Sequence, residues 1–195
     1  MDRRRHQLVD AAMTAMAENR WRSATVSSIC ATAGLNKRYF YESFESLDTL
    51  ADAVVDQVAA EVTGAALAAQ ERTTGQSARE QARAAVAAVV TTLGSDRRRA
   101  LVLLAGSAGA PSAHLRRMDA LRRMTATFVD HALLWHRDRG IEPLTPTAIA
   151  FLIGGTAQAI LSWTEGELPV DAEQLVDEVT ASWLSLGQPC GSDDA

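Results

Sequence analysis

The chain has 195 residues, of which 47% are hydrophobic and 22% charged, and its formal net charge at pH 7 is −5. This balance excludes a disordered chain, and the length suffices to bury a substantial core in one large domain or two small ones. Alanine is frequent, prolines number only five and strand-like alternation is missing, so we expect an all-α fold.

The acidic net charge argues at first against nucleic acid as a partner, but the charges are unevenly distributed. Residues 1–50 carry seven basic and six acidic side chains, a net charge of +1, so the rest of the chain carries −6. Attraction to phosphate depends on where the cations sit rather than on the total. Cys30, Cys190 and the four histidines form no cluster with ligand spacing, so we predict no metal, no cofactor and no catalytic residue.

The first predicted helix covers residues 3–19. Its apolar side chains recur at the spacing of one helix face: they are Leu8, Ala11, Ala12, Ala15 and Met16. Arg3, Arg4 and Arg5 stand at its start as a basic arm, which is either a solvated chain end or a contact to phosphate or the minor groove. Trp21 follows the helix, and we expect its ring to fill the core of the first three helices.

Residues 25–50 hold the most informative pattern, which predicts two short helices joined by a tight turn. Thr25 is a suitable N-cap for the first helix. Cys30 lies on the apolar face of that helix and is predicted to be a buried thiol, with a redox sensor as the alternative. Gly34 falls where a helix end needs a left-handed residue, and Asn36 can cap the second helix.

The second helix of this pair is predicted to turn Phe40 and Phe44 inward, because residues four apart share one face. Its outward face then carries a cation, a guanidinium, a phenol and a hydroxyl, from Lys37, Arg38, Tyr39 and Ser43. Such groups suit the major groove of DNA, where they can meet base edges and phosphates. The pair is therefore predicted to be a helix-turn-helix.

Many positions of this motif agree together with one known family. They are Thr25-x3-Ile29-x4-Gly34-Leu35-Asn36-Lys37-x-Tyr39-Phe40-Tyr41-x2-Phe44-x-Ser46-x2-Thr49-Leu50, after a helix that ends near Trp21. In residue types and spacing, over about residues 3–52, the pattern resembles the DNA-binding domain of the tetracycline-repressor (TetR) family. Arg20 stands where that family usually has a glycine, and Leu47 where many members have a lysine that can touch phosphate.

The resemblance implies a homodimer that binds operator DNA through this domain and is released by a small molecule held in the C-terminal domain. We expect Arg38 and Tyr39 to face base edges. The other predicted DNA-binding residues are Thr25, Ser27, Asn36, Lys37 and Tyr41. The resemblance assigns a phosphate contact to Tyr41, for which packing with the hydroxyl at the rim is the alternative. Arg38 replaces a residue that is often small, so the operator should differ from those of relatives.

The rest of the chain is predicted to be helical. The expected helices cover residues 46–70 (with Ser46 as the N-cap), 77–93, 112–139, 146–165 and 171–186, for about nine helices in all. Arg97 to Arg99 open a further short helical run, which we interpret as a solvated helix face rather than a DNA contact. The predicted domains are a helix-turn-helix domain at 1–46, a ligand-binding and dimerisation domain at 47–187, and a flexible tail at 188–195.

The last two helices are predicted to form the dimer interface, as in the family. The helix over residues 146–165 is apolar on several sides and must be buried, and its small residues allow close backbone approach. Each of the two helices would pack against its copy in an isologous four-helix arrangement. The predicted interface residues are Gly154, Gly155, Ala157, Leu175, Val179 and Trp183.

A ligand pocket is expected between the middle helices, lined by apolar groups and a few polar ones. Ordinary core packing is the alternative for each residue taken alone. As a set, they suit a mostly apolar small molecule with one or two hydrogen-bonding groups. The candidates are Val86, Val90, Leu104, Met124, Phe128, His131, Trp135, Phe151, Gln158 and Trp163.

These features together predict a cytoplasmic, homodimeric, ligand-responsive transcriptional regulator, a repressor at a pseudo-palindromic operator. The charged N-terminus has no apolar signal segment, and no uninterrupted apolar run of about 18 residues suggests a membrane span. Two alternatives remain open: a helical small-molecule-binding protein whose helix-turn-helix serves only packing, and an all-α enzyme.

Overall fold

The structure is a computed structural model, and it describes residues 3–106, 111–137 and 145–186. Side chains are described throughout these ranges except at residues 106, 111–113, 128–137, 146 and 186. All regular structure in the described residues is helical, with no strand among them. This confirms the predicted all-α fold; the predicted tail at 188–195 lies outside the described residues.

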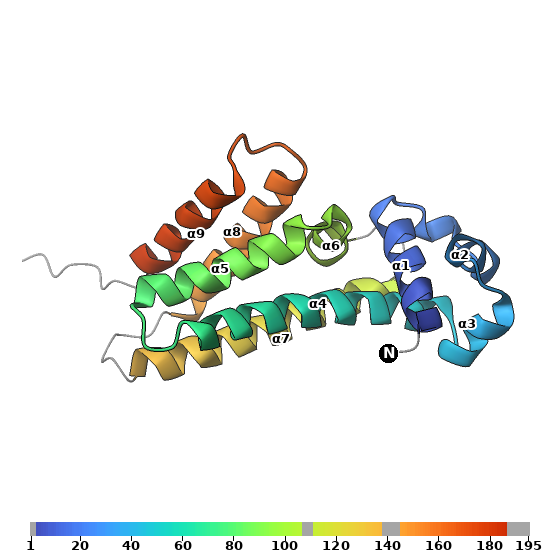
Figure 1. Ribbon diagram of the computed structural model, residues 1–195, viewed down its shortest axis with the longest axis horizontal. Helices are drawn as coiled ribbons and strands as arrows, with labels where there is room; N and C mark the ends of the chain where they lie inside the picture. The colour runs from blue at the N-terminus through green and yellow to red at the C-terminus, as the bar shows by residue number, and fades with distance from the viewer. Residues whose placement is uncertain (1–2, 107–110, 138–144, 187–195) are drawn as a thin grey trace, which may run out of the picture. The chain divides into compact units, whose positions relative to one another are not determined.

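Three helices and one 3₁₀ turn form the N-terminal part (Figure 1). They are α1 (Arg3–Ala17), η1 (Trp21–Ser23), α2 (Val26–Ala33) and α3 (Lys37–Ser43). The first arginines lie inside the opening turns of α1. This agrees with the predicted start of the helix at residue 3, since arginine is a good helix former. The contact to phosphate or the minor groove considered for these arginines stays a prediction.

The described residues after α3 hold six further α-helices. They are α4 (Leu47–Arg72), α5 (Ala78–Gly94), α6 (Arg97–Ala100), α7 (Pro111–Arg137), α8 (Pro146–Thr164) and α9 (Ala172–Leu186), with a π-helical turn, η2 (Leu101–Gly106), directly after α6. A side-chain hydroxyl caps the start of both α4 and α8, and the predicted N-cap Ser46 is confirmed. Ser46 Oγ accepts from the Thr49 N–H at 3.2 Å before α4, and Thr145 Oγ1 accepts from the Ala148 N–H at 3.2 Å before α8.

The chain divides into two compact units, and each is described by itself. Unit 1 comprises Met1–Val62 and Leu93–Arg122, and unit 2 comprises Thr63–Thr92 and Arg123–Ala195. Three helices, α4, α5 and α7, contribute residues to both. The predicted functional boundary after residue 46 stays a prediction, since unit 1 also contains the first part of α4.

The core of unit 1 forms where the apolar faces of its helices meet. In α1 the predicted face is confirmed, and Leu8 and Ala12 are completely buried. Trp21 is also buried, as expected for a ring that fills the core. α4 contributes a stripe of buried apolar side chains, which are Leu50, Val54, Val58 and Val62. The burial of these side chains stabilises unit 1, because burial of large apolar groups is the main stabilising term in folding.

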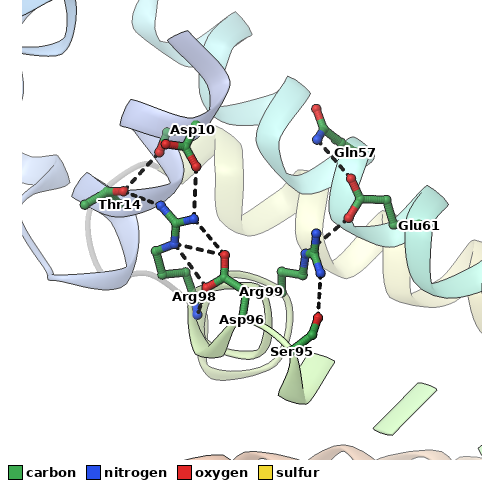
Figure 2. A network of polar contacts seen from close by, with 8 residues as sticks. All are labelled: Asp10, Thr14, Gln57, Glu61, Ser95, Asp96, Arg98 and Arg99. Atoms are coloured by element: carbon green, nitrogen blue, oxygen red, sulfur yellow. Dashed lines mark hydrogen bonds and ion pairs between the residues drawn. The ribbon is translucent and has the colours of Figure 1, made fainter. Parts of the chain in front are cut away.

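Two arginines of the triplet at α6 are tied to other helices of unit 1 (Figure 2). Arg98 pairs with Asp10 of α1 at 2.9 Å and with Asp96, the N-cap of α6, at 2.7 Å. Arg99 pairs with Glu61 of α4 at 3.2 Å. The hydrogen bonds from Arg98 lower the pKa of Asp96. The prediction of a solvated helix face is wrong for these two arginines, because Asp10 and Glu61, which bind them, come from distant parts of the sequence.

In unit 2, α9 is held against α8 and α5. Trp183 of α9 donates its Nε1–H to Thr156 Oγ1 of α8 at 3.0 Å. Arg83 of α5 donates to Asp177 of α9 at 2.7 Å. Figure 1 shows α8 and α9 (orange to red) as neighbouring helices.

Much of the apolar surface of α8 is uncovered in the single chain. Phe151 is 71% exposed, and Gly154 and Gly155 are also exposed. The prediction that this helix is buried is therefore not fulfilled within a single chain. By length and composition alone, Thr147–Thr164 is also the one stretch of the described residues that could cross a membrane. This stretch was not predicted from the sequence, because glycine, threonine and glutamine interrupt its apolar run.

Candidate nucleic-acid interface

The start of α2 is fixed by a capping box. The Ser28 N–H donates to Thr25 Oγ1 at 3.1 Å, and the Thr25 N–H donates to Ser28 Oγ at 2.9 Å. The Thr25 carbonyl accepts from the Ile29 N–H at 3.0 Å. These bonds confirm Thr25 as the N-cap. The capping box does not use the N–H groups of Val26 and Ser27. An external oxygen, such as that of a phosphate, can therefore reach these two groups at the start of α2.

The turn between α2 and α3 has the predicted conformation. Gly34 has φ +66°, in the left-handed region, and its N–H donates to the Ala31 carbonyl. Asn36 Oδ1 then accepts from the Tyr39 N–H at 3.2 Å and caps α3. The Asn36 side chain is therefore used in shaping the turn, and the DNA contact predicted for it stays a prediction.

The inward face of α3 is anchored by two aromatic rings. Phe40 is completely buried and Phe44 nearly so, with ring centroids 6.1 Å apart. Ile29 and Cys30 of α2 are buried as well. Burial raises the pKa of the Cys30 thiol, so the thiol stays protonated and this environment suits the predicted buried thiol better than a redox sensor.

Of the four side chains predicted on the outward face of α3, those of Lys37 and Arg38 are exposed, whereas Tyr39 and Ser43 are half-buried. Lys37 is exposed, the Arg38 side chain is 83% exposed and Tyr41 is 61% exposed. Thr25 and Ser27 of α2 are exposed too. A short helix that offers a cation, a guanidinium and a phenol to solvent has the chemistry to contact phosphates and base edges.

Tyr39 is less open than predicted, because an arginine of α1 lies over its ring. The Arg4 guanidinium carbon is 4.0 Å from the Tyr39 ring centroid, and Tyr39 is half-buried. Arg5 lies similarly over Phe44, at 4.9 Å. These cation–π contacts bring two of the arm arginines to α3. Sequence spacing gave no signal for them, since α1 and α3 meet only in the folded chain.

A second contact that the sequence argument missed joins Arg38 to Glu42. The Arg38 Nε–H donates to Glu42 Oε1 at 2.9 Å, between side chains one helical turn apart on α3. The i,i+4 spacing of a cation and a carboxylate was a signal that could have found this pair.

Two hollows among the described residues are lined by residues other than the predicted ligand-binding ones. Val90 is buried, and Val86, Leu104, Met124 and Trp163 are half-buried. Phe151 and Gln158 are exposed on α8. The side chains of Phe128, His131 and Trp135 lie outside the described ones. A hollow of about 90 Å³ in unit 1 is lined instead by residues such as His6, Asp10 and Arg98. The ligand site therefore stays a prediction.

The predicted interface residues fall into two groups. Gly154 and Gly155 are exposed and Ala157 is half-buried on α8, where a partner could reach them. Leu175 and Val179 are already buried within the single chain. Trp183 is half-buried and bonded to α8. For α9, the structure thus shows contacts within the chain at positions that we predicted to meet a second copy.

No group of three or more His, Cys, Asp or Glu side chains in the described residues has the geometry to hold a metal ion. The acidic side chains near α6 are instead engaged by arginines.

The fold and this surface define a class: a helical protein with an N-terminal helix-turn-helix and a larger helical C-terminal part. No protein-family model and no curated protein matches the chain. Solved structures do match it over nearly its whole length. FadR from Bacillus halodurans, a fatty acid degradation regulator, has a TM-score of 0.79 at 17% identity, covering 94% of this chain and 96% of that chain.

Two further solved structures have the same fold. FadR from Bacillus subtilis, in complex with stearoyl-CoA, has a TM-score of 0.77 at 16% identity, covering 92% of this chain and 97% of that one. A regulatory protein of the TetR family from Rhodococcus has a TM-score of 0.73 at 16% identity, covering 96% and 98%. The chain therefore has the fold of TetR-family regulators, as its helix-turn-helix pattern predicted.

Proposed function

We propose that the protein is a cytoplasmic transcriptional regulator that binds double-stranded DNA as a homodimer, most simply as a repressor. The observation that carries this proposal is the outward face of α3. Lys37, Arg38 and Tyr41 are exposed there, on a helix whose other face is fixed by the buried ring of Phe40. A rigid, polar, cationic helix of this kind fits the major groove.

The contacts divide by role. Arg38 and Tyr39 would face base edges, and Lys37, Tyr41, Thr25 and Ser27 would hold phosphates. Phosphate contacts set affinity and register, whereas base contacts set the preferred sequence. Two protomers would place their α3 helices in successive major grooves, at half-sites about 34–36 Å apart.

The dimer would form through α8 and α9, and the apolar surface that α8 leaves open supports this part of the proposal. Exposed apolar patches of this kind mark surfaces that a partner covers. Gly154 and Gly155 would let the two copies of α8 approach closely.

The effector would be a small, mostly apolar molecule bound in the C-terminal part. A long-chain acyl-CoA, of which only the acyl chain is apolar, is the first to test, because the FadR neighbour from Bacillus subtilis was solved with stearoyl-CoA. The effector would favour a dimer whose α3 helices no longer match the operator, with α4 transmitting the change because it runs from unit 1 into unit 2. It shifts this balance only by its difference in affinity between the two states.

The test is fluorescence anisotropy with DNA from upstream of the protein's own gene, compared with a scrambled duplex at several salt concentrations. Lys37→Ala should weaken binding to all DNA and reduce the salt slope by about one, whereas Arg38→Ala should relax base preference. Arg79→Ala is the control, because Arg79 is an exposed arginine of α5 outside the motif. Equal affinity for native and scrambled DNA would contradict the proposal.

That contrary result would favour a helical small-molecule-binding protein in which the helix-turn-helix only packs. Release of DNA by stearoyl-CoA, but not by free coenzyme A, would support an apolar effector. The solved neighbours reported above are regulators rather than enzymes, and we propose no catalytic activity.

A further inference from the structure

We propose that Glu42 is a specificity-determining residue that holds Arg38 in position to read a guanine in each half-site. This inference rests on the proposed function and extends it to the base that the protein selects. It is carried by the contact between the two side chains and by the groups of Arg38 that this contact leaves available.

The contact engages one edge of the guanidinium. Arg38 donates from Nε to Glu42 Oε1 at 2.9 Å. An arginine has five N–H donors in a planar fork, so the two terminal nitrogens, Nη1 and Nη2, remain to donate outward. Two donors side by side match the O6 and N7 acceptors of guanine in the major groove. Glu42 thus fixes the direction of the fork without occupying its reading end.

Helix stabilisation alone explains this pair poorly. An acidic residue placed C-terminal to the basic one is the less favourable order for an i,i+4 pair. Glu42 also lies in the last turn of α3, which ends at Ser43, where the helix dipole disfavours negative charge. The Arg38 and Glu42 side chains are 83% and 47% exposed, and ion pairs this open contribute little to folding.

Non-specific affinity for DNA does not explain the presence of a carboxylate at position 42 either. A carboxylate on the face of α3 repels the phosphate backbone and offsets one of the few cations there. Glu42 thus weakens the attraction of the protein to DNA of any sequence. In return it orders the arginine that reads the base, which increases selectivity. Once DNA excludes water from the pair, its electrostatic attraction strengthens, since the local dielectric falls.

The experiment measures binding to a series of duplexes in which every base pair of the half-site is changed in turn. In Glu42→Ala, affinity for scrambled DNA should rise about two- to threefold, because one negative charge is lost beside the phosphates. Preference for guanine at the position read by Arg38 should fall about fivefold, and the Glu42→Ala and Arg38→Ala effects on that preference should be non-additive. Glu42→Gln keeps the Oε1 acceptor and should retain part of the preference.

The matched control is Glu45→Ala, which removes an exposed carboxylate just beyond α3. It should raise affinity for all DNA to a similar extent and leave base preference unchanged. Thermal unfolding followed by circular dichroism should show both variants folded, because both side chains are on the surface.

Two results would overturn this role for Glu42. One is an unchanged guanine preference in Glu42→Ala. The other is a loss of preference at a different base pair from the one that Arg38→Ala affects, which would mean that Glu42 reads its own base directly. Both presuppose sequence-specific binding by the wild-type chain. A wild type that binds scrambled DNA equally well contradicts the proposed function itself, so the two failures are distinguishable.

Discussion

Arg98 of α6 and Asp10 of α1 are 88 positions apart in sequence, yet their side chains form an ion pair of 2.9 Å. The same guanidinium donates to Thr14 Oγ1 of α1 at 2.6 Å and to Asp96 at 2.7 Å (Figure 2). The helix that precedes the helix-turn-helix, α1, is therefore held within unit 1 to the segment that begins with α6. Hydrogen bonds and ion pairs, and not apolar packing alone, therefore hold α1 to this segment.

Replacing Arg98 by alanine should destabilise unit 1. The change removes three charge-assisted contacts and leaves Asp96 and Asp10 without their common partner, at a cost of about 1–2 kcal/mol after allowance for partial solvent exposure. Arg122→Ala is the control, since Arg122 is an exposed arginine of α7 in the same unit. Urea unfolding should show a lower midpoint for Arg98→Ala only; equal midpoints for the two variants would mean that the contacts contribute nothing measurable.

The ionised carboxylate of Asp52 in α4 should destabilise the folded protein at neutral pH. Burial raises the pKa of Asp52, although Arg116 lowers it, and Asp52 Oδ1 is buried without a hydrogen-bond partner. A raised pKa means that folding favours the protonated acid. The penalty is therefore present above the raised pKa and disappears as the pH falls toward the ordinary value of about 4.

Asp52→Asn removes this charge and should increase the free energy of unfolding at pH 7, by some tenths to about 1 kcal/mol. The gain over wild type should shrink on acidification and vanish below about pH 4. Urea unfolding of both proteins from pH 7 to pH 3.5 measures it. A gain that stays constant with pH would show that the ionised carboxylate is not its source.

Two glycines should respond to alanine in opposite directions. An added methyl group at Gly34 or Gly64 meets no atom within 4 Å, so only backbone preference decides the effect. At Gly34, φ is +66°, and alanine should cost about 1 kcal/mol, whereas asparagine should cost less. Gly64 lies inside α4, where alanine should stabilise the helix by about 0.5–1 kcal/mol. Thermal melts that shift in the same direction for both alanine variants would refute this account.

Phe151→Glu should convert the proposed dimer to a monomer. The glutamate places a charge on the apolar surface of α8, which a second copy would have to desolvate. Leu115→Glu is the control, because Leu115 on α7 is also 71% exposed and lies outside α8. Sedimentation velocity should show a smaller species for Phe151→Glu alone. Dissociation by both variants, or by neither, would argue against α8 as the specific contact.

The features predicted correctly from the sequence are those that local chemistry decides. Thr25, Gly34 and Asn36 were identified as caps because each rule involves residues within one helical turn. The inward faces of α1 and α3 followed from helical periodicity, and Phe40 is completely buried as expected.

The features that were missed depend on segments meeting in space. Nothing near Arg98 in the sequence indicates that Asp10 would bind it, and nothing near Tyr39 indicates Arg4. In α9, periodicity identified Leu175 and Val179 as apolar, but could not show whether the chain itself or a partner would cover them. The structure shows that the chain itself buries both.

The buried position of Cys30 gives the helix-turn-helix a built-in reporter. Its side chain is only 3% exposed and its pKa is raised, so a thiol reagent can attack it only after α2 has separated from its neighbours. In a Cys190→Ser background, the rate of alkylation of Cys30 would therefore time the opening of this domain. The alkylation rate would then be compared with and without DNA, and with and without an acyl-CoA. A lower rate in the presence of either would show that it stabilises the packing of α2 against its neighbours.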